Sequence, residues 1–388
     1  MARLFSRVDQ SKIADWWWTI DRGLLFCALI LIVTGIVMVA AASPPVAERI
    51  GIGQFYFLKR HIIVLVPSVA IMIAISFLSP RNIWRLASLI FIGSLFMMVV
   101  VLVAGDEVKG ARRWIRVMGF SLQPSEFAKM SFAVVGAWVM YLKKEKLNFP
   151  GYWVLAGLYG LVVLLMMMQP DFGMTVVTSV IFGTHIFLAG CPIWVVFGLA
   201  GAAFGGVIFS YFMFSHIRSR IDRFLNPDSG DTYQIEKSLE AFKEGGLFGT
   251  GPGQGTVKLS IPDAHADFIF SVAGEEFGLI FLLPFIGLFL YMILRGLNKI
   301  MREDDVFIVL TVSGILVMFA MQAFVHMGSS LGILPSKGMT LPFISYGGSS
   351  LLSSAIAMGI VLGLTRRQVQ KSIARGGAVK KRGRTHHE

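Results

Sequence analysis

The sequence predicts an all-α, polytopic integral membrane protein with ten transmembrane helices and a large extracytoplasmic loop between helices 7 and 8. Composition is the first indication: 55% of the 388 residues are hydrophobic, only 15% are charged, and the mean hydropathy is +0.71. These values exclude an ordinary soluble domain. The second indication is the recurrence of apolar runs of about 20 residues, the length that a helix needs to cross a bilayer.

Ten such runs follow one another along the chain. The expected spans are residues 23–43, 61–78, 86–104, 124–142, 152–168, 172–190, 193–214, 268–294, 306–328 and 343–364. They divide the protein into an N-terminal segment (1–22), a ten-helix membrane domain (23–365) with its outer loop (215–267), and a tail (366–388).

The distribution of basic residues predicts the orientation. An even number of spans places both termini on one side, and the tail carries eight Lys and Arg residues with the terminal Glu388 as its one acid. The short loops at Arg81, at 143–146 and at 295–302 are also basic. By the positive-inside rule, both termini and these loops are expected to be cytoplasmic.

The outer loop 105–123 is basic against this rule. Its cations are Lys109, Arg112, Arg113 and Arg116. One explanation is that they bind an anionic group at the outer leaflet, which we favour. The other is that they pair with Asp106, Glu107 and Glu126 of the same region.

The motif QPSEFAK (123–129) opens the fourth span. Pro124 suits a helix start, and Gln123 or Ser125 can cap it. Lys129 lies about one turn inside the span, where an ammonium must snorkel, pair or line a polar cavity. Pairing with Glu126 at i, i+3 and a hydrophilic cavity that contains both residues are equally compatible with the sequence.

Three further segments are interpreted as follows. QPDFG (169–173) is expected to form a tight turn in which Asp171 caps the next helix. The spacing of apolar residues over 231–242 predicts an amphipathic helix that ends at Gly245. The glycine-rich segment 249–255 lacks the Lys-Ser/Thr ending of a phosphate-binding loop, so we reject nucleotide binding and expect a flexible lid or hinge.

The stretch 258–276 carries the strongest functional signal. It contains Asp263, His265 and Asp267, and then enters an apolar run with Glu275 and Glu276. Carboxylates at or below the membrane surface are costly and therefore mark functional sites. Asp267 is expected both to cap the next helix and to do chemistry.

Glu275 and Glu276 are expected to be structural, bonded within the bundle to Lys129 or to an outer-loop Arg. Because neighbours on a helix point about 100° apart, we expect the two not to share one role. The last outer loop (334–350) offers Lys337 and Ser345, and suits either close helix packing or a re-entrant segment that lines a ligand.

Together these motifs resemble the SEDS family of bacterial cell-wall polymerases. The resemblance rests on GARRWI, QPSEFAK, QPDFG, YQIEKSLEAFKEGGLFGTGPGQG, DAHADFIFSVAGEEFG and KGMTLPFISYGGSSL in this order, and it covers residues 21–367. Several segments, VKLSIPDAHADF among them, are more similar to the division-type members than to the elongation-type members. Ala266, where Thr is common, and IPDAH in place of LPEAH are small departures that remove no titratable group.

The resemblance implies a peptidoglycan glycosyltransferase that polymerises lipid II, a disaccharide-pentapeptide on undecaprenyl pyrophosphate, at the outer face of the inner membrane. It implies an inverting single displacement, a class B penicillin-binding transpeptidase and other division proteins as partners, and a place at the division septum. We expect the protein to contact membrane lipid and expect no contact with nucleic acid.

The residue chemistry fits these roles. Asp267 is the expected general base for the acceptor hydroxyl, and cations would stabilise the departing pyrophosphate. The substrate-binding candidates are Arg113, Arg116, Lys129, His265, Lys337 and Ser345, and the supporting residues are Glu126, Asp171, Glu275 and Glu276. The sequence requires no cofactor and shows no metal motif, and it leaves Mg²⁺ open as a helper.

Three alternatives stay open. They are a flippase for a lipid-linked precursor, an elongation-type polymerase, and a scaffold that activates its partner. A transporter is expected to have internal repeats with interrupted helices in matching halves. The sequence has no convincing repeat, and its polar groups gather at one membrane face, which favours chemistry at the outer interface.

Overall fold

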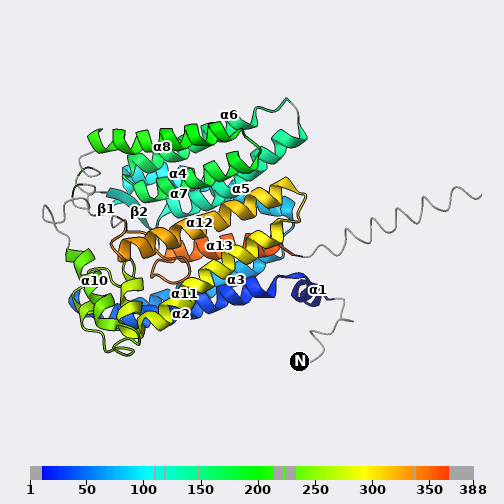
Figure 1. The fold of residues 1–388 in the computed structure, drawn as a ribbon. Coiled ribbons are helices and arrows are strands. Elements are labelled where there is room, and N and C mark those ends of the chain that lie inside the picture. Colours follow the sequence, from blue (N-terminus) through cyan, green and yellow to red (C-terminus); the bar gives the residue numbers. More distant parts are fainter. Residues whose placement is uncertain are drawn as a thin grey trace, which may run out of the picture.

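The computed structural model describes residues 11–108, 111–117, 119–146, 148–213, 218, 222, 233–334 and 338–366. Its long helices run along a common direction (Figure 1). They are α2 (Arg22–Arg49), α3 (Tyr56–Ser76), α4 (Pro80–Ala104), α5 (Pro124–Glu145), α6 (Gly151–Met168), α7 (Phe172–Leu188), α8 (Ile193–Met213), α11 (Ile269–Ile300), α12 (Val306–Ser330) and α13 (Gly348–Leu364). Shorter helices are α1 (Lys12–Thr19), α10 (Tyr233–Gly245) and the 3₁₀ turn η2 (Val257–Leu259).

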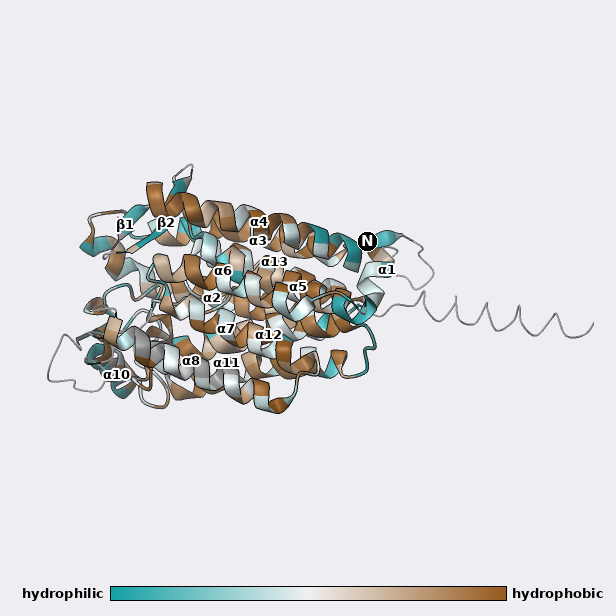
Figure 2. Cartoon of the chain, turned by 90° about the horizontal axis from the view of Figure 1, so that it is seen from above, coloured by the Kyte–Doolittle hydropathy of each residue, from teal (hydrophilic) through white to brown (hydrophobic). Residues whose placement is uncertain are grey.

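These helices form an integral membrane bundle. Helices α12 and α13 lie between a group formed by α4–α8 and a group formed by α2, α3 and α11 (Figure 1). Among the described residues, α2, α3, α4, α6, α11 and α12 are long and apolar enough to cross a membrane, and α7 and α13 are shorter apolar helices. Large apolar side chains such as Leu89 (70% exposed) and Val103 (79% exposed) face outward, and hydrophobic colour covers the outside of the helices (Figure 2). An apolar exterior is what a lipid environment requires.

A helix covers each predicted span, with shifted boundaries. Helices α3 and α4 begin five to six residues earlier than expected, at Tyr56 and Pro80. Pro80 suits this position because a helix start needs no amide donor there. The last span was placed too early, since α13 begins at Gly348.

The all-α prediction is wrong for the basic outer loop. It forms an antiparallel sheet of three strands in the order β1-β2-β3, namely β1 (Asp106–Val108), β2 (Ala111–Val117) and β3 (Phe120–Leu122). The register places Ile115 opposite Leu122 and Asp106 opposite Trp114. Pairing gives the backbone groups hydrogen-bond partners where the helix has ended. Strands this short and this charged carry no clear alternation in sequence.

The two ends of the described chain meet at one end of the bundle. The Arg366 guanidinium lies 3.4 Å from the Asp15 carboxylate and donates a 3.0 Å hydrogen bond to Thr19 Oγ1. The sheet and α10 lie at the opposite end (Figure 1). Some predictions concern residues that lie outside the described ones. These residues are 1–10, Lys109, most of 214–232, Lys337 and 367–388.

Helix α11 is interrupted, although a continuous span was expected. Gly278 has φ +72° and ψ −178°, which breaks the helix. The chain just after α10 satisfies the backbone groups at the break: Leu279 N donates to Gly246 O (3.0 Å), and Thr250 N donates to Glu275 O (2.9 Å). The glycine-rich segment expected to be a lid therefore lies against α11 in this structure.

The segment before α13 re-enters the bundle as a non-helical turn. Phe343 is buried with φ +67° and packs its ring 5.3 Å from that of Phe319. It approaches α2 at Gly35, where a Cβ atom would lie 2.5 Å from Phe343 O and 2.9 Å from Ile344 Cα. A side chain on α2 at this position would displace the turn.

Candidate active site

Asp267 lies in a tight turn between η2 and α11. Asp267 N and Ala266 N both donate to Asp263 O, at 3.0 and 2.9 Å, and Asp263 adopts φ +52°. The N-cap of α11 is Phe268, so the prediction that Asp267 occupies the capping position is wrong by one residue. The turn holds the Asp267 carboxylate just outside the helix start.

The re-entrant segment fixes this turn from the other side. Ser345 Oγ donates to Ala266 O (2.7 Å), and Tyr346 N donates to His265 O (3.0 Å). A Cβ atom on Gly338 would lie 3.3 Å from Asp267 Oδ2. Ser345 therefore acts in this structure by positioning the turn. Asp267 is a half-buried carboxylate whose flanking backbone is held by a separate part of the chain.

His265 packs between two aromatic rings. Its ring centroid lies 4.3 Å from that of Phe57 and 5.1 Å from that of Tyr346, and only 6% of the residue is exposed. Burial lowers the pKa of His265 to about 4, against the upward pull of the Asp263 carboxylate. A neutral imidazole at physiological pH suits an orienting role rather than a phosphate clamp.

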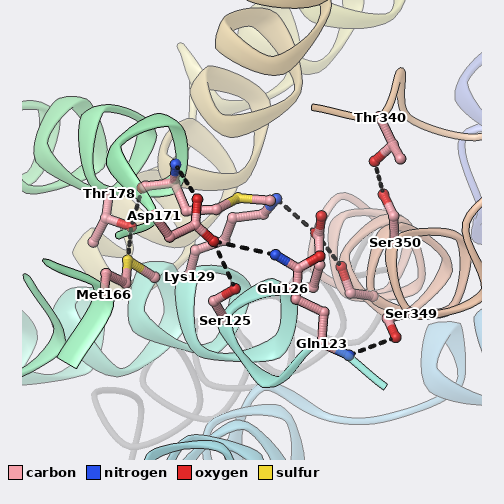
Figure 3. Close-up of polar contacts among 12 residues, drawn as sticks. Gln123, Ser125, Glu126, Lys129, Met166, Asp171, Thr178, Thr340, Ser349 and Ser350 are labelled. Atoms are coloured by element: carbon pink, nitrogen blue, oxygen red, sulfur yellow. Dashed lines mark hydrogen bonds and ion pairs between the residues drawn. The ribbon is translucent and has the colours of Figure 1, made fainter. Parts of the chain in front are cut away.

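A second cluster lies in the bundle beside α5 (Figure 3). Lys129 Nζ lies 2.6 Å from Glu126 Oε2 and 3.3 Å from Met174 Sδ, and Ser353 Oγ donates to Glu126 Oε2 at 3.4 Å. Lys129 and Glu126 are at most 2% exposed. Of the two interpretations left open by the sequence, mutual pairing is the arrangement present here.

Asp171 joins this cluster to the basic loop. Its carboxylate accepts from Met174 N (3.4 Å), which confirms its role as the cap of α7. It also accepts from Gln123 Nε2 (3.1 Å) and Ser125 Oγ (3.3 Å). Gln123 occupies the N-cap position of α5, as one of the two predicted alternatives, but its side chain makes no capping hydrogen bond. The side chains of Gln123 and Ser125 turn toward Asp171 instead (Figure 3).

The arginines of the basic loop have partners within the protein. Arg113 donates to Gln169 O (3.0 Å) and to Pro170 O, and its Nη1 lies 3.9 Å from Asp171 Oδ1. Arg116 Nε lies 2.9 Å from Asp106 Oδ2 while its side chain is 77% exposed. Exposed ion pairs contribute little, so an anionic ligand could replace Asp106 at Arg116 at small cost.

Within the described part of the chain, Glu275 and Glu276 bind neither Lys129 nor an arginine of the outer loops. Glu275 accepts from Val257 N (2.7 Å) and Lys258 N (2.9 Å), and Glu276 pairs with Lys258 Nζ. The expectation that they cannot share one role is also wrong. The 3₁₀ turn η2 presents backbone amides to one carboxylate and a side chain to the other, so both hold the same segment ahead of Asp267.

Sequence reasoning missed three residues near the site. Lys258 Nζ reaches Glu276 and donates to Ala41 O at 3.1 Å. Arg60 donates to Gly119 O and lies over the rings of Tyr56 and Phe120. The Tyr346 ring packs against that of His265 at a tilt of 45°. A signal for Arg60 was available in the sequence, because Lys59 and Arg60 stand at the start of a span that is expected to face outward, against the positive-inside rule.

The segment 340–353 connects the Asp267 turn to the cluster around Lys129 and Glu126. Ser349 Oγ accepts from Gln123 N (2.9 Å), Thr340 Oγ1 donates to Ser350 Oγ (2.6 Å), and Ser353 reaches Glu126. The same segment fixes the Asp267 turn through Ser345. The structure thus brings most of the predicted residues to one end of the bundle. Such an arrangement pairs a carboxylate able to accept a proton with nearby cations able to stabilise an anionic leaving group.

Comparisons with known proteins agree with this geometry. A family model described as "Cell cycle protein", which groups FtsW, RodA and SpoVE, matches residues 21–370. The chain is 42% identical over 365 residues to the probable peptidoglycan glycosyltransferase FtsW of Caulobacter vibrioides, with 94% of each sequence covered. It is 36% identical to the protein of the same name from Idiomarina loihiensis, with 92% of this chain and 90% of that one covered.

Two solved structures share the fold. A chain of a peptidoglycan synthase complex, described as coordinating polymerization and crosslinking, matches with a TM-score of 0.76 and 27% identity over 91% of this chain and 100% of that one. The rod shape determining protein RodA of Thermus thermophilus matches with a TM-score of 0.65 and 26% identity over 90% and 97%.

Proposed function

Because this chain belongs to the family of FtsW, RodA and SpoVE, we propose that it is a peptidoglycan glycosyltransferase of the cell-division type. It polymerises lipid II into glycan strands at the outer face of the bacterial inner membrane. The division assignment follows the relatives named FtsW, and the alternative is an elongation-type, RodA-like polymerase. Its partners are a class B penicillin-binding transpeptidase, in keeping with the similar chain of a peptidoglycan synthase complex, and other proteins of the division septum.

The proposed topology has ten spans, both termini in the cytoplasm, and the 215–267 loop outside. The contact of Arg366 with Asp15 supports an even number of crossings. The position of α10 and the sheet at the other end of the bundle supports an outer location for the site (Figure 1). The basic residues of the tail and of the short loops set the direction.

In the proposed mechanism, Asp267 accepts the proton of the acceptor sugar hydroxyl. The hydroxyl oxygen forms a bond to the anomeric carbon of the donor while the bond to the pyrophosphate oxygen breaks. The α-linked donor gives a β-linked product in this single displacement, so no protein nucleophile is needed. The observation that carries the proposal is the half-buried Asp267 carboxylate, whose backbone is fixed by Ser345 and Tyr346.

Arg113, Arg116 and Lys129 are the proposed contacts of the pyrophosphate, with Lys337 as a further substrate-binding residue. Ser345, also a substrate-binding candidate in the sequence, is proposed to position the Asp267 turn instead. Each of the first three has an acidic neighbour, namely Asp171, Asp106 and Glu126. Phosphate oxygens would therefore replace these partners during the reaction. A charged hydrogen bond of this kind contributes about 1.5–3 kcal/mol.

The test is polymerisation of purified lipid II by the purified protein with its transpeptidase partner. Asp267→Asn keeps the shape of the side chain and removes the base, so the rate should fall by at least roughly 100-fold while folding and partner binding stay normal. Asp263→Asn is the matched control, because Asn also tolerates positive φ. Long glycan strands made by Asp267→Asn would refute the assignment of the base.

The same assay separates the other hypotheses. A flippase would move lipid II across proteoliposome membranes without forming glycosidic bonds, and a scaffold would depend on an intact polymerase in its partner. The interrupted helix α11 does not favour transport, because the backbone groups at its break are bonded to residues 246–251. We propose that no cofactor is required, and repeating the assay with EDTA tests whether Mg²⁺ assists.

A further inference from the structure

The end of the bundle away from the candidate active site carries a cluster of cations around one buried carboxylate. Asp21 is 3% exposed and lies between α1 and α2. Arg295 Nε donates to its Oδ1 at 2.6 Å, and Lys299 Nζ lies 2.9 Å from its Oδ2. Two cations thus share one carboxylate, which leaves one positive charge over.

These cations border a hollow on the surface of α11. The hollow has a volume of about 350 Å³ and is lined by Tyr291, Leu294, Arg295, Asn298 and Lys299. The Arg295 side chain is 39% exposed and that of Lys299 is 30% exposed. Their charged groups therefore bind Asp21 and still border the hollow.

The packing of α2 against α11 shapes this site. The Arg295 guanidinium and the Tyr291 hydroxyl lie so close to Gly23 that any side chain there would overlap them. Arg22 stands next to Gly23 and lies over the rings of Trp17 and Trp18, 4.9 and 4.6 Å from their centroids. Arg22 adds a further positive charge, and the two indole rings are typical of a membrane interface.

Apolar side chains continue from the cations along both helices. Leu290 and Leu294 on α11 are 54% and 50% exposed, and Phe26 and Ile30 on α2 are 49% exposed each. The two helices lie side by side (Figure 1), and Cys27 Sγ donates to Leu288 O at 3.2 Å. A ligand here would meet cations and amide donors at one end and hydrocarbon surface at the other.

We propose that this hollow binds the phosphodiester headgroup of an anionic phospholipid from the adjoining leaflet. Arg295, Lys299 and Asn298 donate to the phosphate oxygens, and the acyl chains lie along α2 and α11. If the cluster served only to join the two helices, Asp21 and one cation would suffice. The second cation, the amide of Asn298 and the neighbouring apolar surface fit a lipid.

The experiment compares thermal unfolding of the full-length protein in a neutral detergent after addition of phosphatidylglycerol, phosphatidylcholine or inorganic phosphate. Phosphatidylglycerol should raise the unfolding temperature by roughly 2–5 °C, and the other two additions should not. In Lys299→Gln and in Asn298→Ala this rise should fall by at least half. Asn298 is absent from the ion pairs with Asp21, so its variant tests the hollow without breaking the cluster.

Arg81→Gln is the matched control, because Arg81 is an exposed cation at the start of α4 and does not line the hollow. It should keep the full response to phosphatidylglycerol. An equal loss in Arg81→Gln would mean diffuse attraction to anionic lipid and would overturn the proposal. An equal rise with phosphatidylcholine, or with inorganic phosphate, would overturn it as well.

Discussion

Lys258 connects the segment ahead of Asp267 to two helices. Its ammonium pairs with the buried Glu276 on α11 and donates to Ala41 O on α2, and its own side chain is 6% exposed. A charge in such a place is costly unless it is paired. The pair therefore acts together with Glu275, which accepts from Val257 N and Lys258 N, to hold η2 ahead of the Asp267 turn.

Lys258→Met should destabilise the protein by about 3–5 kcal/mol, because it leaves the Glu276 carboxylate buried without its cation. Thermal unfolding in detergent measures this loss. The double variant Lys258→Met/Glu276→Gln removes the unpaired charge and should recover most of the stability. A single variant as stable as the parent would show that the pair does not hold this segment.

His265 predicts a dependence of stability on pH. Its pKa is about 4 when folded, because of burial, and about 6.5 when unfolded. Between these values the unfolded chain binds more protons, so stability falls as the pH drops from about 6.5 to 4, by up to about 3 kcal/mol. His265→Phe keeps a ring against Phe57 and Tyr346 and cannot titrate. Its stability should change less over this range, and identical pH profiles would contradict the assignment.

At the scale of elements, the re-entrant segment before α13 depends on the absence of a side chain at Gly35. The segment carries Ser345 and Tyr346, which fix the turn of Asp267. A shift of this segment would therefore move the proposed base, although Gly35 itself touches no substrate. The geometry of the proposed active site depends in this way on packing between α2 and a distant part of the chain.

Gly35→Ala should reduce lipid II polymerisation roughly 10-fold or more, since a displacement of about 1 Å can cost a factor of 100. The new methyl group would lie 2.5 Å from Phe343 O. Gly93→Ala is the matched control: Gly93 is exposed on α4 and a Cβ atom there meets nothing within 4 Å. Both changes raise helix propensity equally, so equal activities in the two variants would exclude the packing explanation.

For the whole molecule, the proposed topology predicts which residues a membrane-impermeant thiol reagent can reach. In a background with Cys27→Ala and Cys191→Ala, Lys243→Cys on α10 should be labelled from outside the cell. Lys144→Cys at the end of α5 should be labelled only after the membrane is opened. Both residues are exposed, so the difference reports sidedness, and the reverse pattern would refute the orientation.

The helices were predictable because hydrophobic run length depends only on local composition. The family was predictable because the motifs are long and ordered. The role of Asp267 as the base rests on the same motifs and stays a prediction. The partners of Glu275 and Glu276 were not predictable in the same way. The pairing of Lys129 with Glu126 follows from their helical spacing. In contrast, Lys258 reaches Glu276 only through the geometry of a 3₁₀ turn. The small sheet escaped prediction because strand pairing is a contact between segments.

The break in α11 bears on how the protein is made in the cell. At 1.5 Å per residue, the part after Gly278 (279–300) is about 33 Å long and can cross the hydrocarbon by itself. The part before it carries Glu275 and Glu276, whose partners lie in the loop synthesised earlier. In the proposed topology this loop lies outside, so it must already have been exported when α11 leaves the translocation machinery. Until it binds, the two carboxylates and the amides at Gly278 remain unsatisfied. Export of the outer loop is therefore a condition for α11 to reach its final depth.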